Sequence, residues 1–240
     1  MQAFPGLKVI ESCLTCHLRA GRLFCDLPAD ALATLERIRE TSVVPSHSPV
    51  FREGEQPRGV YVLCSGKAKL STNSKDGKTI ILKIAEEGEV LGLSATVSAI
   101  PYEISAETIE PARLNFISTQ KFMKFLNEHG EACLRVAKLL SNNYQSAYEE
   151  IRSLGLSNSV SQRLAKLLLE RAERANAGSN SNQMKFHLPF SHEEISQMIG
   201  ASRETVTRLL NDFRNKRLIQ MNGATVLIPD RRSLADMVNS

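Results

Sequence analysis

Apolar and polar positions follow two different rhythms along this chain. Between residues 43 and 117 the apolar residues come in short runs separated by glycines. Short runs with frequent turns predict an antiparallel sandwich or barrel. The clearest predicted strands are residues 60–64, 67–70 and 79–84, with Lys75-Asp76-Gly77 as a hairpin turn. Helical spacing replaces this pattern from residue 119 to 154, with a break near residues 128–130, so the chain is predicted to be α+β.

Helical spacing also appears at both ends of this β-rich region. Residues 27–41 predict a helix with Leu32, Leu35 and Ile38 on one side. After the break, a 3-4 spacing typical of a coiled coil runs through Cys133, Val136, Leu140, Asn143, Ala147, Glu150 and Leu154. We interpret it as a dimerisation helix whose partner contacts are Val136, Leu140, Asn143, Ala147 and Leu154. The alternative is a helix that lies along the core of its own domain.

Two short helices joined by a turn are predicted near the C-terminus. Ser191 and Glu194 form a capping box for the first helix, and Gly200 ends it. Ser202 caps a second helix that extends to about residue 214, and its apolar positions recur with helical spacing at Val206, Leu209, Leu210 and Phe213. Asn222-Gly223 between two apolar runs then predicts a β-hairpin. This order is typical of a winged helix-turn-helix.

The other face of the second helix carries side chains that can read DNA. Arginine donates two hydrogen bonds to guanine, and glutamate accepts one from cytosine. Together with the capping serines, the candidate DNA-contacting residues are Ser191, Ser202, Arg203, Glu204, Thr207, Arg208 and Asn211. The alternative is an ordinary helical hairpin with a solvated polar face.

Composition narrows the class of protein. The chain has 240 residues and a net charge of +4. Residues 156–240 contain 12 Lys and Arg against 8 Asp and Glu, so the whole positive excess lies on the predicted DNA-binding part. Neither a signal peptide nor an apolar span of membrane length is evident, so we expect a cytoplasmic protein with reduced thiols. The sequence shows no catalytic motif, and we expect no enzyme activity.

The recognition-helix sequence Ser202-Arg203-Glu204-Thr205-Val206-Thr207-Arg208 resembles that of the CRP/FNR family of bacterial transcription regulators. The resemblance implies an N-terminal cyclic-nucleotide-binding-like β-roll (jelly roll), a long dimerisation helix and a C-terminal winged helix-turn-helix. The implied segments are residues 1–26 with the cysteines, 27–130 as sensor, 131–156 as dimerisation helix and 157–240 as DNA-binding domain. The resemblance further implies a homodimer that binds double-stranded DNA with TGA-type inverted repeats. It implies that Arg203, Glu204 and Arg208 read the bases and that RNA polymerase is a partner. A competing interpretation is a redox- or small-ligand-binding sensor whose DNA binding is weak.

The effector site departs from the cyclic-nucleotide branch of that family. That branch has a glutamate for the ribose and an arginine for the phosphate, where this chain has Leu93 and Ile104. Neither side chain offers an acceptor for the sugar or a cation for the phosphate. We therefore expect that cyclic AMP is not the effector.

The N-terminal cysteines resemble those of the oxygen-sensing branch. Cys13, Cys16 and Cys25 are candidate ligands of an iron–sulfur cluster, since thiolates suit such clusters or zinc. Zinc, a thiol switch and no bound metal remain alternatives, and Cys13-x-x-Cys16-His17 also matches the attachment string of c-type haem. The resemblance places the fourth cysteine at Ala112, so the fourth ligand is unknown, with Cys64 and Cys133 as the remaining cysteines.

Overall fold

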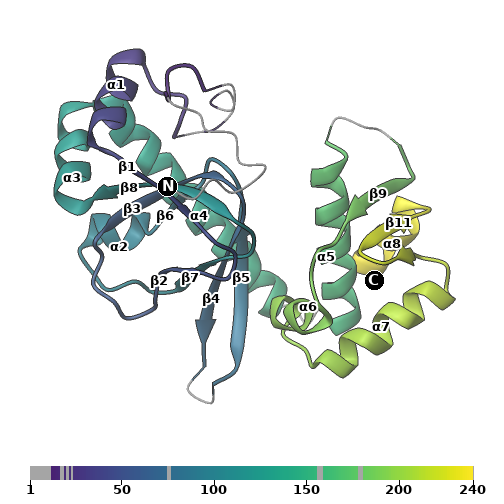
Figure 1. The fold of residues 1–240 in the computed structure, drawn as a ribbon. Helices are drawn as coiled ribbons and strands as arrows, with labels where there is room; N and C mark the ends of the chain where they lie inside the picture. Colours follow the sequence, from purple (N-terminus) through teal and green to yellow (C-terminus); the bar gives the residue numbers. More distant parts are fainter. Residues whose placement is uncertain are drawn as a thin grey trace. The chain divides into compact units, whose positions relative to one another are not determined.

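The computed structural model divides the chain into two compact units, residues 1–147 and 148–240. It describes residues 12–16, 19, 22, 24–74, 77–155, 159–177 and 181–239, of which residues 149–155 and 239 are described by backbone only. Figure 1 shows strands and helices in the first unit and mainly helices in the second. In the described part of the chain, no helix combines the length and the apolar character needed to cross a bilayer.

The first unit is built on two antiparallel four-stranded sheets. One sheet has the order β1 (Glu40–Val44), β8 (Ala112–Ser118), β3 (Gly59–Ser65) and β6 (Val90–Leu91). The other has the order β2 (Pro49–Phe51), β7 (Ser105–Thr108), β4 (Ala68–Asn73) and β5 (Thr79–Ala85). The predicted strands 60–64, 67–70 and 79–84 are thus confirmed as β3, β4 and β5. Two residues of the predicted hairpin turn, Lys75 and Asp76, lie outside the described residues.

Alternating side chains of β3 and β8 serve two separate cores, because successive residues of a strand point to opposite faces. Leu63, Ala112 and Leu114 belong to a core that also takes apolar residues from the strands of the other sheet. Val60, Val62 and Ile117 belong to a core that takes residues from the helices. The sheet β1-β8-β3-β6 therefore has one face towards the second sheet and one face towards the helices.

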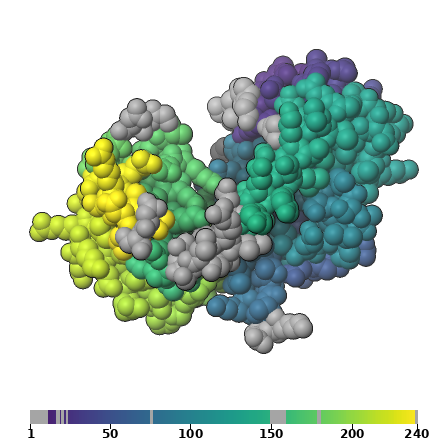
Figure 2. Space-filling view, turned by 180° about the vertical axis from the view of Figure 1, so that it is seen from behind, coloured from purple at the N-terminus to yellow at the C-terminus, as the bar shows by residue number. Residues whose placement is uncertain are grey.

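This unit is completed by α1 (Ala29–Ile38), α2 (Leu93–Ser98), α3 (Thr119–Glu128) and the larger part of α4 (Gly130–Gly155), whose residues from 148 onward belong to the second unit. Figure 2 shows α1 in purple beside the teal helices, at one end of the unit. The predicted break near residues 128–130 is confirmed between α3 and α4. The helix predicted over 27–41 is shorter, because residues 40 and 41 pair with β8 as part of β1.

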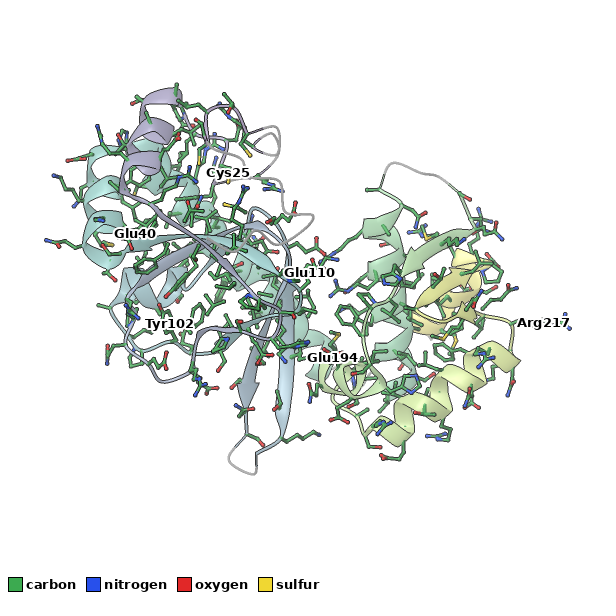
Figure 3. All side chains as sticks on the ribbon, in the orientation of Figure 1. Cys25, Glu40, Tyr102, Glu110, Glu194 and Arg217 are labelled. Atoms are coloured by element: carbon green, nitrogen blue, oxygen red, sulfur yellow. The ribbon has the colours of Figure 1, made fainter. Side chains whose placement is uncertain are left out.

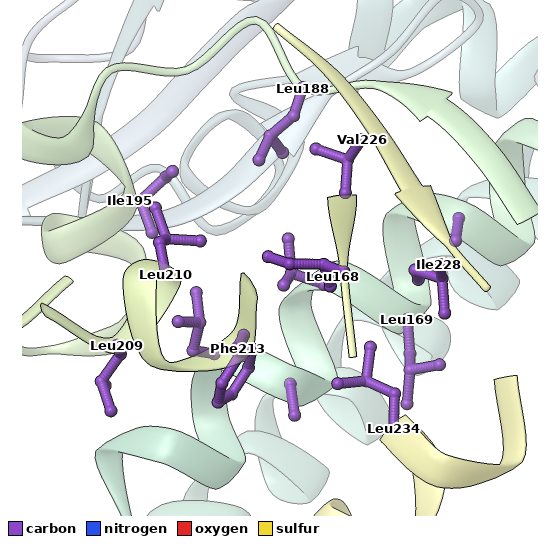
Figure 4. Packing of buried hydrophobic residues seen from close by; sticks show 14 of the residues in the cluster. Leu168, Leu169, Leu188, Ile195, Leu209, Leu210, Phe213, Val226, Ile228 and Leu234 are labelled. Carbon is purple, nitrogen blue, oxygen red and sulfur yellow. The ribbon is translucent and has the colours of Figure 1, made fainter. Parts of the chain in front are cut away.

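The second unit packs helices against a three-stranded sheet. It contains α5 (Val160–Ala175), β9 (Met184–His187), α6 (His192–Ile199), α7 (Arg203–Asn215), β10 (Gln220–Asn222), β11 (Thr225–Ile228) and α8 (Arg231–Asn239), with strand order β10-β11-β9. Figure 4 shows Leu168 of α5, Phe213 of α7 and Val226 of β11 in one apolar cluster. This shared core holds α7 against α5 and the sheet.

The predicted hairpin is present, but its turn is one residue later than expected. Asn222 pairs with Thr225, so the two loop residues are Gly223 and Ala224. Gly223 has φ +57°, in the left-handed region that a glycine adopts without strain. A glycine at the first loop position is what a type II′ turn prefers.

Candidate functional site

Three local features define both ends of α6 and the start of α7. The Ser191 hydroxyl accepts from the Glu194 backbone N–H at 3.2 Å, and the Glu194 carboxylate accepts from the Ser191 N–H at 2.8 Å. Gly200 ends α6 with φ +61°, which a glycine adopts without strain. Ser202 then accepts from the Thr205 N–H at 3.2 Å and starts α7. Figure 3 marks Glu194 on α6 and Arg217 after α7. The capping boundaries predicted from the sequence are confirmed.

Helix α7 has one buried and one exposed side. Val206, Leu209, Leu210 and Phe213 are buried in the core of the second unit. The polar side lines one open concave surface, which we call the α7 face: Arg203, Glu204, Thr207, Arg208, Asn211 and Asp212. It contains every candidate DNA-contacting residue except the two capping serines. Asp212 was missed from the sequence, although it lies four residues after Arg208 and therefore on the same side of the helix.

Glu204 is suited to accept hydrogen bonds at neutral pH. Hydrogen bonds from its own backbone N–H and from the Ser202 hydroxyl hold the pKa of its carboxyl below the usual range. The carboxylate also lies in the first turn of α7, where the helix dipole favours negative charge. Glu204 is therefore an acceptor flanked by two arginines, Arg203 and Arg208.

A second helix positions Thr207. His192 Nδ1 at the start of α6 lies 2.8 Å from the Thr207 hydroxyl oxygen. That hydroxyl donates its proton to the Arg203 carbonyl oxygen at 3.0 Å. Because a hydroxyl has one proton, the His192 ring nitrogen must be the donor in their contact. His192 was missed from the sequence, since nothing local shows that it reaches residue 207.

The predicted dimer residues fall into three groups. Val136 is 3% exposed and packs in the helix-side core of its own unit, and Leu140 is half-buried against that core. Asn143 and Ala147 are exposed, and the side chain of Leu154 lies outside the described residues, as does that of Glu150. Beside them, Leu134, Tyr144 and Tyr148 are large apolar residues with exposed fractions of 56%, 71% and 56%.

Four cysteines line one cavity of about 30 Å³ on the helix side of the first unit: Cys13, Cys16, Cys25 and Cys64. Figure 3 shows Cys25 close to α1. Burial, and then the neighbouring Cys64 and Cys13, raise the pKa of Cys25 to about 12. Burial also raises the pKa of Cys13 and Cys64. The fifth cysteine, Cys133, is exposed on α4. His17 lies outside the described residues.

The thiols of this cavity are not gathered as tightly as the ligands of one metal ion. Within the described ranges, no three His, Cys, Asp or Glu side chains are placed so that they could hold an ion. Ala112, where the resemblance places the family's fourth cysteine, is fully buried between the two sheets. Its side chain therefore lies on the opposite face of β8 from the cavity.

The two positions that depart from the cyclic-nucleotide pattern contribute to packing. Leu93 is 3% exposed in the helix-side core, and Ile104 packs against the core between the sheets. In that second core the rings of Phe51 and Tyr102 stack with centroids 4.0 Å apart. The Tyr102 hydroxyl donates to the Gly59 carbonyl oxygen at 3.0 Å.

Comparison with known families assigns each unit separately. A model of cyclic nucleotide-binding domains matches residues 42–129, and a model of Crp-like helix-turn-helix domains matches residues 162–237. The first range holds both four-stranded sheets except two residues of β1, and the second holds α6, α7 and the hairpin.

Individual relatives extend this likeness over most of the chain. A CRP-like cAMP-activated global transcriptional regulator of Mycobacterium tuberculosis is 29% identical over 217 residues, covering 90% of this chain and 96% of the relative. The anaerobic regulatory protein of Bacillus subtilis is 24% identical, covering 86% of each. The solved structure of a c-di-GMP-responsive global regulator of Xanthomonas campestris covers 84% of this chain and 99% of its own, with TM-score 0.73 and 20% identity. The two curated relatives are named as regulators, not as enzymes.

Proposed function

This chain belongs to the CRP/FNR family of DNA-binding transcription regulators, and from that premise we propose that it acts as a homodimer on an inverted repeat with TGA-type half-sites. The observation that carries the proposal is the α7 face, where Arg203, Glu204 and Arg208 are all exposed on one helix. Two forked cations and one ionised acceptor can form base-specific hydrogen bonds in the major groove. The buried side of α7 keeps this face in a fixed orientation.

We propose that Ser191 and Ser202 position the helices and that Asn211 extends the contact surface. Both serine hydroxyls already cap a helix. The helix N-termini that they cap expose backbone N–H groups, which favour DNA phosphates. Contacts of this kind fix the register of a protein on DNA without reading its sequence.

We propose that the dimer forms along an exposed side of α4. Leu134, Ala137, Ser141, Tyr144 and Tyr148 repeat with the 3-4 spacing of a coiled coil. Leu134, Tyr144 and Tyr148 have exposed fractions of 56%, 71% and 56%, whereas Val136 is covered by its own unit. Leu140 and Ala147 flank this side of the helix and remain proposed contacts. A symmetric pair would place its two recognition helices about 34 Å apart, one turn of DNA.

We propose that the first unit senses a signal other than cyclic AMP through its cysteines. Leu93 and Ile104 occupy the positions where the cyclic-nucleotide branch has the glutamate and the arginine that bind the nucleotide. Both side chains pack in apolar cores. The cavity lined by four thiols is the other candidate site of this unit. A link to RNA polymerase remains an expectation from the family.

Binding measurements at several salt concentrations test the proposed function. A duplex with two TGA-type half-sites, with centres about 10 base pairs apart, is compared with a scrambled duplex of equal composition. We expect the inverted repeat to bind at least a thousandfold more tightly at physiological salt, with one dimer per duplex. Equal affinity for both duplexes at every salt concentration would contradict the proposal and favour a sensor with weak DNA binding.

A further inference from the structure

Tyr102 lies between the two four-stranded sheets, and each of its polar groups takes part in a hydrogen bond. Its side chain is 3% exposed, and its hydroxyl donates to the Gly59 carbonyl oxygen at 3.0 Å. Its backbone N–H donates to the Glu55 carbonyl oxygen at 2.9 Å, and its own carbonyl oxygen accepts from the Gly54 N–H at 2.8 Å. Figure 3 labels Tyr102 in the first unit. Three hydrogen bonds therefore fix Tyr102 against the turn that follows β2 and the start of β3.

The turn that leads to Tyr102 contains a residue with an unfavourable backbone conformation. Ala99 has φ +54°, in the left-handed region that a residue with a Cβ adopts at a cost. The N–H groups of Ala99 and Ile100 both donate to the Ala95 carbonyl oxygen, so this residue ends α2. Such conformations persist where the surrounding structure holds them, and they are frequent at ligand-binding sites. The strained turn takes the chain from α2 back to the space between the sheets.

The Tyr102 ring is closely enclosed by its neighbours. It stacks on the Phe51 ring with centroids 4.0 Å apart and an angle of 17° between the planes. A Cβ atom built on Gly92 would lie 2.9 Å from Tyr102 Cε1, which is closer than such contacts normally come. Gly92 also has φ +74°, so both its backbone and the Tyr102 ring oppose a side chain at this position. The space is thus shaped to one aromatic ring.

This space lies where the family resemblance places the effector. Gly92 directly precedes Leu93, and Ile104 packs against the same core between the sheets as Tyr102. Leu93 and Ile104 occupy the expected positions of the glutamate and the arginine that bind a nucleotide. Small-molecule sites combine apolar walls with a few polar groups that fix orientation. The Tyr102 ring has both kinds of contact, with Phe51 and with a backbone carbonyl.

Helix α2 connects the Tyr102 ring with the core on the helix side of the unit. Gly92 is the N-cap of α2, and Ala95 is buried in the core between the sheets. Leu93, at the first turn of α2, is buried in the helix-side core. That core also contains Val136 of α4, the helix that carries the proposed dimer contacts. Coupling between sites is carried by packed side chains of this kind, so a contact that fixes the start of α2 can act on α4.

We propose that Tyr102 is a built-in ligand of the first unit. Its phenol ring occupies the space between the sheets and holds the start of α2 in place without a small molecule. Tyr102 is then a positioning residue for α4. The proposal goes beyond the proposed function, because it assigns this space to the chain itself. A free phenol is the class of ligand that fits once the Tyr102 ring is removed, since its ring can stack on Phe51 and its hydroxyl can donate to Gly59.

The test is chemical rescue of Tyr102→Ala in the full chain. The substitution removes one phenol group, and the vacated space should bind free phenol, because apolar cavities bind aromatic molecules. Benzene has the same ring but leaves the Gly59 carbonyl without a donor, so it should bind more weakly. Binding is measured as the rise of the unfolding temperature with ligand concentration. We expect phenol to stabilise Tyr102→Ala and not the wild type. Equal responses of the two proteins to phenol would overturn the proposal.

A matched variant separates the ligand role from ordinary packing. Leu114→Ala also removes an apolar side chain from the core between the sheets, where Leu114 is 2% exposed. Hydrogen exchange of α2 and of residues 132–140 in α4 is compared with and without phenol. We expect faster exchange of both segments in Tyr102→Ala, reversed by phenol, and no effect of phenol on Leu114→Ala. A change confined to the strands in Tyr102→Ala, or equal reversal in the two variants, would overturn the proposal.

A milder pair of variants keeps the test decisive if Tyr102→Ala does not fold. Tyr102→Phe retains the ring and removes only the hydrogen bond to Gly59. Tyr61→Phe removes a hydroxyl from the neighbouring ring, which lies 5.9 Å from Phe51. We expect exchange of α2 to be faster in Tyr102→Phe and unchanged in Tyr61→Phe. Wild-type exchange of α2 in Tyr102→Phe would contradict the proposal.

DNA binding by the same proteins separates this proposal from the proposed function. Tyr102→Ala should bind the inverted repeat about tenfold more weakly than the wild type, which corresponds to a coupling of ordinary strength, and phenol should restore the affinity. Wild-type affinity of Tyr102→Ala without phenol would refute the link from Tyr102 to α4 and leave the proposed function intact. A wild type that does not prefer the inverted repeat refutes the proposed function, whereas phenol binding and hydrogen exchange still decide the role of Tyr102.

Discussion

Single residues of the α7 face have different tasks because their hydrogen bonds differ. The guanidinium groups of Arg203 and Arg208 are exposed, whereas the Thr207 hydroxyl donates to the Arg203 carbonyl and accepts from His192. The single proton of the Thr207 hydroxyl is therefore already donated within the protein. The Thr207 methyl group is the part of the side chain that is suited to contact a base in the major groove. The sequence predicted the position of Thr207 on this face. It could not predict the contact with His192, because that contact depends on the angle between two helices.

Thr207 is expected to read a thymine through its methyl group. Threonine methyl groups contact the C5-methyl of thymine in the major groove. Replacing the contacted dT by dU removes one methyl contact and should weaken wild-type binding about fourfold, from roughly 0.8 kcal/mol per buried methyl(ene) group. Fluorescence anisotropy with a duplex for each thymine of the half-site measures this.

Two variants separate the methyl group from the hydroxyl. Thr207→Val keeps the methyl group and should remain sensitive to dU, whereas Thr207→Ser should bind dT and dU duplexes equally. A Thr207→Ser protein that still discriminates dT from dU would show that another residue reads the methyl group.

The cysteines are expected to differ in reactivity when no metal is bound. The pKa of Cys25 is raised to about 12, so at pH 8 only about one molecule in ten thousand carries its thiolate. Cys133 is exposed on α4. Alkylation by iodoacetamide at pH 8, followed by peptide mapping, should label Cys133 first and Cys25 last. Labelling of Cys25 should accelerate as the pH rises towards 12, because the thiolate is the nucleophile. Equal rates at the two cysteines would contradict the burial of Cys25.

At the scale of elements, the helices whose ends carry local sequence signals were predicted well. A strand whose pairing partner lies far away in the sequence was missed. The caps at Ser191 and Ser202 and the glycine at Gly200 act within one turn of helix, and they defined α6 and α7 correctly. Strand β9 was missed, because it has four residues and pairs with β11 about forty residues later. The coiled-coil spacing on α4 could not show which side of this helix is covered by the rest of the first unit. That coverage buries Val136 and leaves Tyr144 exposed.

A charge on the exposed side of α4 is expected to separate the dimer. Tyr144→Glu places two negative charges across the proposed seam, and like charges oppose association. We expect its dimer dissociation constant to rise at least tenfold, measured by analytical ultracentrifugation. Ser146→Glu is the matched control, since Ser146 is exposed on the opposite side of the same helix. If both variants dimerise like the wild type, the seam lies elsewhere.

At the scale of the whole molecule, the chain combines a domain of the cyclic nucleotide-binding type with a Crp-like helix-turn-helix domain. The sequence predicted the two domain types that the family models match, and Leu93 and Ile104 stay, as predictions, the residues that replace the nucleotide-binding glutamate and arginine. It did not predict which thiols line one cavity, because Cys64 lies on β3 whereas Cys13, Cys16 and Cys25 come about forty to fifty residues earlier in the chain. Side-chain direction in this unit is set by sheet register, which involves residues about fifty positions apart.

Cyclic AMP is expected not to bind in a saturable way. Leu93 and Ile104 offer no hydrogen bond to the ribose and no charge to the phosphate. Isothermal titration calorimetry with millimolar cyclic AMP should show only heats of dilution. A dissociation constant in the micromolar range would contradict this account of the first unit, even though a relative named as cAMP-activated is 29% identical.

The most direct test of DNA reading by α7 compares Arg208→Ala with Lys216→Ala on half-sites changed one base pair at a time. Arg208 is on the α7 face, whereas Lys216 lies just beyond the end of the helix. Arg208→Ala should cost about 1–3 kcal/mol of specific binding and abolish the preference for one guanine. Lys216→Ala should weaken all duplexes alike and reduce the salt dependence by about one phosphate contact. An Arg208→Ala protein that keeps the wild-type preference at every position would contradict the assignment of α7 as the recognition helix.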